Sequence, residues 1–201
     1  MSRRSLGLLA VVVATLTVNA SADNKFDYCL LCHGANANGN EGIRAPKLSG
    51  MEPWYLTRQL ENFASGARGV PAEDTAGHEM GPVGMRVKSE GTLEAVVQFI
   101  GTLESKRPAR TVTGDVAHGK VLYAACAACH GVKGEGNAAV QAPALAARTD
   151  WYLVTQLTNY QKGIRGADPR DAYGPQMRAI AATLPDENAV ADVVAYINTL
   201  K

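Results

Sequence analysis

The four cysteines of the chain occur in two copies of one short motif, Cys-x-x-Cys-His. In this motif two thiols on one helical turn can form thioether bonds to the vinyl groups of a haem, and the imidazole that follows can bind the haem iron. The motif residues are Cys29, Cys32 and His33 in the first copy and Cys126, Cys129 and His130 in the second. The two motifs therefore predict two covalently attached haems c.

Other uses of paired cysteines fit the sequence less well. A thioredoxin-like redox pair requires a βαβ context, and no alternating strand pattern accompanies either motif. A closed zinc site needs additional Cys or His ligands at suitable spacing, and the chain has no further Cys. Disulfides inside the two motifs would leave the adjacent histidines without a role, so haem attachment is the favoured interpretation.

Both motifs belong to a longer internal repeat. Equivalent positions are 97 residues apart, and this offset continues without a gap far beyond the motifs. Further matches are Ala45-Pro46 with Ala142-Pro143, Trp54-Tyr55-Leu56 with Trp151-Tyr152-Leu153, Gln59 with Gln156, and Arg68-Gly69 with Arg165-Gly166. Two copies indicate a duplicated domain, since a solenoid needs about three repeats or more. We expect domain 1 over residues 23–104, a polar, proline-containing linker over 105–114, and domain 2 over 115–201.

A methionine is the expected sixth ligand of each iron. Met80 and Met177 are equivalent under the 97-residue offset, and each precedes the last helix of its domain in a glycine-containing segment that we predict to be a loop. Thioether sulfur favours ferrous iron, so His/Met ligation predicts two haems of fairly high potential. Two protein ligands leave no iron position open for oxygen, peroxide or another substrate, which indicates electron transfer.

Two other side chains compete with Met80 for the first iron. Met85 follows Gly81-Pro82-Val83-Gly84, which locally resembles the segment before Met177, but choosing Met85 would break the gapless offset. His78 would give a bis-His site, but its equivalent in the second half is Pro175. We therefore predict Met80, with Met85 and His78 as the alternatives.

The spacing of apolar residues predicts an all-α fold. An i, i+3, i+4, i+7 pattern occurs at Leu93, Val96, Val97 and Ile100, and again at Val190, Val193, Val194 and Ile197. Each pattern predicts a terminal helix, which we expect to begin near Ser89-Glu90 in domain 1 and near Pro185-Asp186 in domain 2. A middle helix is expected over residues 54–63 and 151–160.

The N-terminus has the pattern of a secretory signal peptide. Arg3 and Arg4 precede an apolar run over residues 6–18, and small residues follow up to Ala22. The run is shorter than the roughly 20 residues that a membrane-spanning helix needs. We expect cleavage after Ala22 and an exported, soluble protein without direct insertion into the membrane.

The overall charge is close to neutral, with 20 Lys and Arg against 19 Asp and Glu. Nothing in this balance indicates nucleic-acid binding. The charge is less even along the chain, because residues 23–104 carry 7 basic and 11 acidic side chains whereas residues 115–201 carry 8 of each. In a protein that docks transiently, an acidic first domain could orient the encounter with a partner.

Together, the motifs, the duplication and the paired methionines resemble class I cytochrome c domains, and in tandem they are similar to the dihaem cytochrome c4 family and its c553-like relatives. The resemblance covers essentially the whole chain after residue 22. It implies that His33 and His130 are the proximal iron ligands and that Met80 and Met177 are the distal ones. The thioether bonds are implied for Cys29, Cys32, Cys126 and Cys129. The carbonyl groups of Pro46 and Pro143 are implied as hydrogen-bond acceptors for the proximal imidazoles.

The same resemblance implies a periplasmic protein of a Gram-negative bacterium. Its partners would be a membrane quinol-oxidising complex or a dehydrogenase as electron donor and a terminal oxidase or reductase as acceptor. We expect no enzyme activity, because a dihaem peroxidase needs an open or displaceable iron position. Related sulfur-oxidising enzymes use a Cys-ligated haem, whereas all four cysteines are assigned here to thioether bonds. A dedicated haem subunit of a larger dehydrogenase complex stays open as the alternative to a free shuttle.

Overall fold

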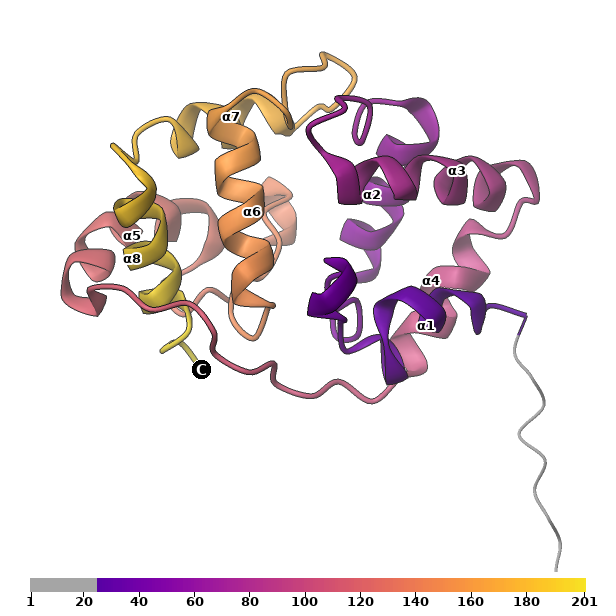
Figure 1. Ribbon diagram of the computed structural model, residues 1–201, viewed down its shortest axis with the longest axis horizontal. Helices are drawn as coiled ribbons and strands as arrows, with labels where there is room; N and C mark the ends of the chain where they lie inside the picture. Colours follow the sequence, from indigo (N-terminus) through magenta and orange to yellow (C-terminus); the bar gives the residue numbers. More distant parts are fainter. Residues whose placement is uncertain (1–24) are drawn as a thin grey trace, which may run out of the picture.

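A computed structural model of the protein describes residues 25–201, so the expected signal peptide over residues 1–22 and its cleavage after Ala22 lie outside the described part. The described chain forms two helical domains that lie side by side, joined by an extended segment along one edge (Figure 1). It contains eight α-helices and three short 3-10 helices. In place of strands, the described residues show only two isolated bridges, so the all-α prediction is confirmed.

The two domains use corresponding helices. The first contains α1 (Tyr28–His33), α2 (Pro53–Ser65), α3 (Thr75–Ser89) and α4 (Leu93–Thr102), with the 3-10 turns η1 (Ala35–Ala37) and η2 (Glu41–Ile43). The second contains α5 (Val116–His130), η3 (Ala138–Val140), α6 (Asp150–Gln161), α7 (Gly174–Ala181) and α8 (Glu187–Ile197). No helix within residues 25–201 combines the length and the apolar character that crossing a membrane would require.

The terminal helix of domain 2 forms as its sequence predicts. The Asp186 carboxylate accepts a hydrogen bond from the Ala189 N–H group and so caps the first turn of α8. Val190, Val193 and Val194 are at most 1% exposed, and they pack with α5 and α6 in the core of this domain. The buried stripe therefore supplies most of the driving force for this helix through removal of apolar surface from water.

The predicted start of the terminal helix in domain 1 is wrong. Ser89 is the last residue of α3, and its hydroxyl donates to the carbonyl of Arg86 instead of capping a new helix. The chain then turns at Gly91, which has a positive φ of 64°, and α4 begins at Leu93 after Thr92. Ser89 still belongs to α3, four residues before Leu93, and Thr92 occupies the N-cap position of α4.

The prediction that the two methionines lie in loops is also wrong. Met80 lies inside α3, which is capped by the Asp74 carboxylate accepting from Gly77 N–H, and Met177 lies inside α7. The glycine content of this region has a packing cause, because a Cβ atom on Gly84 would come within 3 Å of the backbone of α2. Gly84 therefore permits a close helix crossing, and the segment does not need to be a loop.

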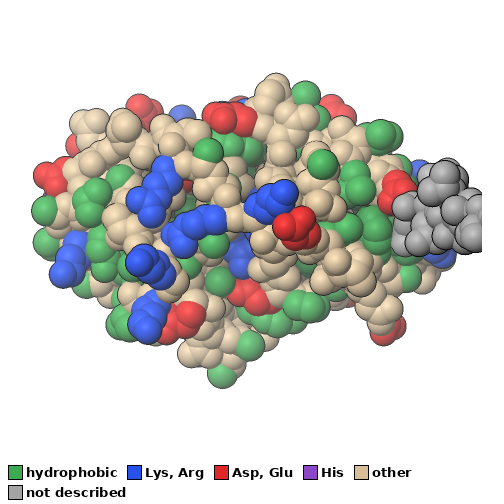
Figure 2. Space-filling view, turned by 90° about the horizontal axis from the view of Figure 1, so that it is seen from below, with side chains coloured by type: hydrophobic (Ala, Val, Ile, Leu, Met, Phe, Trp, Pro, Cys, Tyr) green, Lys and Arg blue, Asp and Glu red, His purple; other side chains and the backbone are tan. Residues whose placement is uncertain are grey.

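The linker is fastened to both domains. The Lys106 N–H group donates to the Asn38 side chain of domain 1, and the N–H groups of Thr111 and Val112 donate to the buried Asp150 carboxylate of domain 2. On the face along which the linker runs, Lys and Arg side chains gather near the middle (Figure 2). The linker itself contributes three basic side chains, Lys106, Arg107 and Arg110.

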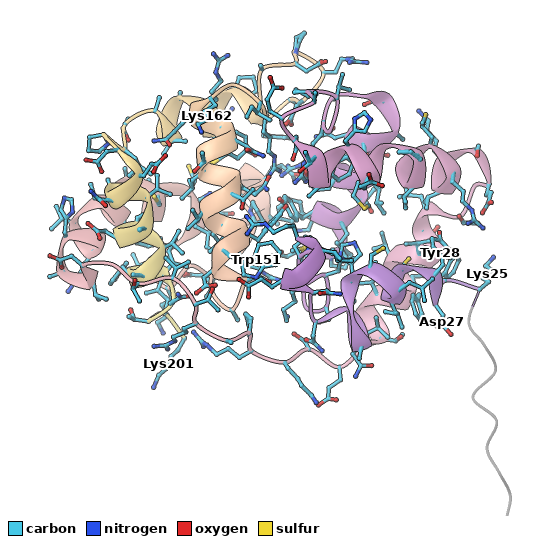
Figure 3. All side chains as sticks on the ribbon, viewed as in Figure 1. Lys25, Asp27, Tyr28, Trp151, Lys162 and Lys201 are labelled. Carbon is cyan, nitrogen blue, oxygen red and sulfur yellow. The ribbon has the colours of Figure 1, made fainter. Side chains whose placement is uncertain are left out.

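Hydrogen bonds also join the domains directly. Arg44 Nη2 donates to Thr155 Oγ1 at 2.7 Å, and Arg58 Nη1 donates to Gln141 Oε1 at 3.2 Å. Residues 44 and 141 are equivalent under the 97-residue offset, as are residues 58 and 155, so the two contacts are related by an approximate twofold exchange of the domains. Trp151 at the start of α6 lies between the domains (Figure 3), with the Arg44 guanidinium 5.0 Å from its ring centre.

A single glycine sets the contact between α5 and α8. A Cβ atom on Gly119 would overlap the carbonyl group of Asp192, whereas one on Gly101 in α4 would meet nothing within 4 Å. We predict that Gly119→Ala lowers the free energy of unfolding by about 1–3 kcal/mol through overpacking. The matched change Gly101→Ala should raise it by about 0.5–1 kcal/mol, because alanine is the better helix former. Thermal unfolding of the two variants measures both effects, and equal melting temperatures would contradict this packing.

Candidate haem sites

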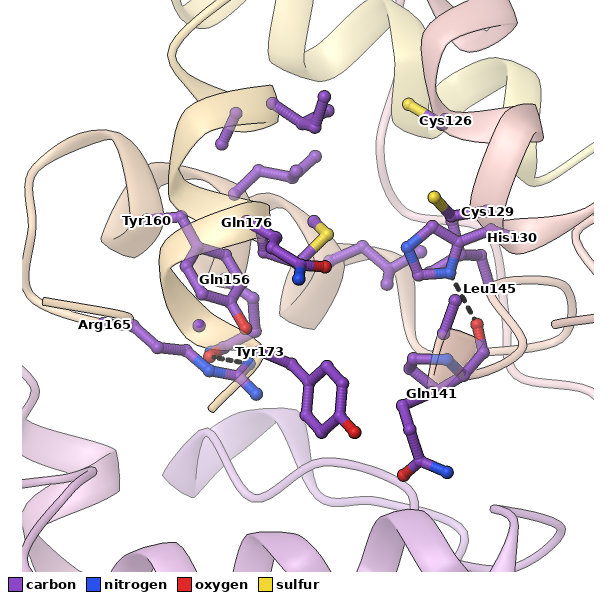
Figure 4. Close-up of a pocket in the computed structure, with 18 of the residues that line it drawn as sticks. Cys126, Cys129, His130, Gln141, Leu145, Gln156, Tyr160, Arg165, Tyr173 and Gln176 are labelled. Carbon is purple, nitrogen blue, oxygen red and sulfur yellow. Dashed lines mark hydrogen bonds between the residues drawn. The ribbon is translucent and has the colours of Figure 1, made fainter. Parts of the chain in front are cut away.

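The second motif lies at the end of α5, where its three residues face one cavity. His130 is the last residue of α5, and Gly131 ends the helix with a φ of 81°. Cys126, Cys129 and His130 all line a cavity that is closed on other sides by α6, α7 and α8 (Figure 4). The helix thus delivers two thiols and one imidazole to the same space, as haem attachment requires.

The first motif is built in the same way. His33 ends α1, and Gly34 follows it with a φ of 75°. Cys29 is partly buried and Cys32 is exposed, which matches the exposure of their equivalents in domain 2. The structure pairs none of the four cysteines in a disulfide. Burial raises the pKa of the Cys29 thiol, and the same cause raises the pKa of Cys126, its equivalent.

A proline carbonyl holds each imidazole in place. His33 Nδ1 lies 2.7 Å from the Pro46 carbonyl oxygen, and His130 Nδ1 lies 2.7 Å from that of Pro143. A carbonyl can only accept, so each Nδ1 carries the proton and donates it to the bond. The hydrogen bonds implied by the family resemblance are therefore confirmed.

The imidazoles are held in the form that binds a metal. Both rings are at most 5% exposed. Burial lowers the pKa of His33 and His130, and the hydrogen bond to the proline carbonyl offsets only part of this effect. A neutral imidazole protonated on Nδ1 keeps the Nε2 lone pair free, so each ring can donate Nε2 to iron.

A methionine accompanies each imidazole. The structure brings Met80 together with His33, and Met177 together with His130. Met177 lines the same cavity as the motif of domain 2, and both methionines are partly buried. The equivalent positions on α3 and α7 therefore present one thioether to each motif, although both lie on helices and not on loops.

The two competitors of Met80 are placed differently. Met85 is 54% exposed on α3. His78 is also exposed, and its Nδ1 atom lies 3.2 Å from the carbonyl oxygen of Gly69, nine residues earlier in domain 1. These surroundings favour Met80 as the ligand for the first iron, and its assignment stays a prediction.

The cavity of domain 2 has the character of a haem site. One side is apolar, formed by Leu122, Leu145, Leu153, Leu157, Val193 and Ile197. Among residues 25–201, no cluster of three or more His, Cys, Asp or Glu side chains is arranged to bind a bare metal ion. An apolar wall, two thiols and one free imidazole nitrogen fit a flat, covalently attached macrocycle that brings its own metal.

The opposite side of this cavity is polar, and part of it comes from domain 1. Tyr55, Arg58 and Gln59 of α2 line the cavity together with Gln156 and Arg165 of domain 2. Sequence analysis found Tyr55 and Gln59 only as matches within the repeat and assigned them no role. Their place at the second site depends on how the domains pack against each other, which the repeat alone does not specify.

Comparison with known proteins gives a consistent result. A model of the family described as cytochrome c matches residues 24–104 and 116–201. The chain is 32% identical over 181 residues to a thiosulfate dehydrogenase electron acceptor from Stutzerimonas stutzeri, covering 84% of this chain and 78% of the relative.

Two solved structures are similar to the described fold. Reduced recombinant cytochrome c4 from Pseudomonas stutzeri superimposes with a TM-score of 0.67 at 25% identity, covering 88% of this chain and 95% of that one. Thiosulfate dehydrogenase from Marichromatium purpuratum gives a TM-score of 0.65 at 30% identity. The matched region covers 86% of this chain but only 36% of the dehydrogenase chain, so the likeness concerns one part of that protein.

The two methionines of α3 provide a matched pair of variants. In the oxidised holoprotein, Met80→Ala should remove one of two equivalents of the absorption band that arises from methionine sulfur bound to ferric haem. Met85→Ala should retain both equivalents, because the Met85 side chain is mostly exposed. Quantitative absorption spectra normalised to haem content make the comparison. Loss of the band in Met85→Ala with retention in Met80→Ala would contradict the assignment.

Proposed function

The chain belongs to the cytochrome c family, and from this membership we propose that it is a periplasmic carrier that passes electrons from a donor protein to an acceptor through two His/Met-ligated haems. It is a dihaem, cytochrome c4-like electron carrier and not an enzyme. Its two Cys-x-x-Cys-His motifs are the attachment sites of two haems c. The proposal further specifies the iron ligands, the cellular compartment and the redox partners.

One observation carries the ligand assignment. In both domains, a buried imidazole whose Nδ1 is bound to a proline carbonyl is brought together with a methionine at the equivalent position. We assign His33 and Met80 to the first iron and His130 and Met177 to the second. The thioether bonds are assigned to Cys29, Cys32, Cys126 and Cys129. With haem bound, these side chains would leave no iron position open, so each site would be suited to outer-sphere electron exchange.

The side chains around the second site favour rapid electron exchange. Bound haem supplies a one-electron ferric/ferrous couple. The hydrogen bond from His130 to the Pro143 carbonyl fixes the ring orientation and makes Nε2 a stronger donor to iron. Apolar side chains such as Leu153 and Val193 exclude water from the cavity, so little solvent has to reorganise when the charge of the site changes.

The domain limits and the compartment follow the sequence pattern. We propose a signal peptide over residues 1–22, domain 1 over 23–104, a linker over 105–114 and domain 2 over 115–201. The family match over residues 24–104 and 116–201 supports this division. Cleavage after Ala22 would release the protein into the periplasm, where covalent haem attachment follows export.

For the electron donor we propose a dehydrogenase, and a thiosulfate dehydrogenase is the first candidate. This choice is supported by the relative from Stutzerimonas stutzeri, which is named an electron acceptor of such an enzyme. A membrane quinol-oxidising complex is the alternative donor, and a terminal oxidase or reductase is the proposed acceptor. A haem subunit held permanently in a dehydrogenase complex is the alternative to a free shuttle, and it would elute with the enzyme in gel filtration of a native extract.

Carbon monoxide binding tests whether the protein is a carrier. We predict that the reduced holoprotein binds no carbon monoxide at neutral pH, because both axial positions of each iron are held by protein side chains. Met177→Ala should bind one equivalent per two haems, since one position is then open. Optical titration with carbon monoxide measures both results. Ready binding by the unchanged protein would indicate an open haem and favour an enzyme such as a peroxidase.

A further inference from the structure

Two equivalent arginines lie buried between the domains. Arg68 follows α2 and is 6% exposed, and Arg165 follows α6 and is 4% exposed. Two glutamine oxygens bridge their guanidinium groups. Gln59 Oε1 accepts from Arg68 Nη1 and Arg165 Nη2, both at 2.8 Å. Gln156 Oε1 accepts from Arg165 Nη1 at 2.8 Å and from Arg68 Nη2 at 3.0 Å. We call these two side chains the arginine pair.

Each arginine also binds a tyrosine of the other domain. Arg68 Nη2 donates to Tyr152 Oη at 2.9 Å, and Arg165 Nη2 donates to Tyr55 Oη at 3.2 Å. The two tyrosines are equivalent under the 97-residue offset. Neither guanidinium therefore completes its hydrogen bonds without the opposite domain, and the arginine pair is a feature of the two-domain protein as a whole.

The charges of the arginine pair are not balanced by carboxylates in direct contact. Among the ion pairs formed by residues 25–201, none joins Arg68 or Arg165 to Asp or Glu. The Nε atoms of both side chains are buried without a hydrogen-bond partner. Two like charges that share neutral acceptors in a buried place destabilise the fold. Such a local cost is typical of sites where function constrains the residue types.

The arginine pair lies beside the second haem site. Arg165, Gln59 and Gln156 line the same cavity as His130 and Met177. In Figure 4, Arg165 and Gln156 lie at the end of the cavity that faces domain 1. Arg68 is the equivalent of Arg165 under the 97-residue offset.

The positive charges of both arginines act on the Tyr55 hydroxyl, which lines this cavity. Burial raises the pKa of the Tyr55 hydroxyl, but the charges of Arg165, Arg68 and Arg58 and the hydrogen bond from Arg165 together hold the pKa below its usual value. Tyr55 lines the cavity of domain 2, so a charge on the segment of domain 1 that follows α2 is felt at the site of the other domain.

We propose that Arg68 and Arg165 form a shared positioning pair whose positive charge raises the reduction potential of both haems and links the two potentials. A nearby positive charge destabilises ferric haem relative to ferrous haem, and the effect is large where little water screens it. The pair is bridged by Gln59 and Gln156 across the interface, so both haems experience both charges. This inference rests on the proposed function, because it requires two haems with His/Met ligation.

Charge-removing and charge-keeping variants test the proposal by potentiometric titration with signals assigned to each haem. Arg68→Gln and Arg165→Gln should each lower both potentials, and the double variant should lower both further. Arg68→Lys and Arg165→Lys should keep both potentials close to those of the unchanged protein. Shifts confined to the domain of the altered residue, or equal shifts in the Gln and Lys variants, would overturn the proposal.

Arg170 provides a matched control. It also joins the domains, since its guanidinium donates to the carbonyl groups of Ser65 and Gly66, but its side chain is 57% exposed. Arg170→Gln should leave both potentials nearly unchanged, because solvent screens an exposed charge. A shift as large as that of Arg165→Gln would show that loss of domain contacts, and not the buried charge, changes the potentials.

A second pair of variants keeps the test valid if a Gln variant fails to fold. Tyr55→Phe and Tyr152→Phe remove the two arginine–tyrosine bonds across the interface and leave the glutamine bridges and all charges in place, so both should leave the potentials nearly unchanged. A large drop in these variants would overturn the electrostatic account.

The methionine band of the unchanged protein separates the proposed function from the role of the arginine pair. Absence of this band refutes the proposed function, whereas unshifted potentials in folded Gln variants that retain the band refute only the role of the arginine pair.

Discussion

A hydrogen bond between a buried imidazole and a proline carbonyl is the interaction on which both sites depend. It spans 13 residues in each domain and has the same length of 2.7 Å in both. The bond ties the end of the motif helix to the segment that leads into the middle helix, and it fixes which ring nitrogen is free. Without it, the imidazole would lack both a defined tautomer and a defined direction.

The two domains complete each other. The cavity of domain 2 has a polar side built partly from α2, and the arginine pair is satisfied only when both domains are present. The contacts Arg44 with Thr155 and Arg58 with Gln141 join the same two repeat positions. In the first contact the arginine is at position 44, and in the second it is at position 58, which is the equivalent of Thr155. The duplicated domains have therefore kept one packing geometry while its individual contacts changed.

Much of the architecture was predictable from the sequence, because the information is local or repeated. The spacing of Cys126, Cys129 and His130 is by itself enough to predict haem attachment. The 97-residue offset shows each motif residue a second time at the equivalent position. The loop expected around Met80 was wrong because glycine has two uses: it permits turns, and it permits close helix crossings such as that of Gly84 with α2. The arginine pair could not be predicted, since its partners lie in the other domain and no local periodicity marks them.

The central claim is that both irons of this two-domain protein are held by a histidine and a methionine. A proton nuclear magnetic resonance spectrum of the fully reduced holoprotein tests it directly, because the ring current of haem shifts the methyl signal of a bound methionine far upfield. The account predicts two such methyl signals, and in Met80→Ala the one assigned to domain 1 is lost. One signal or none in the unchanged protein would contradict it.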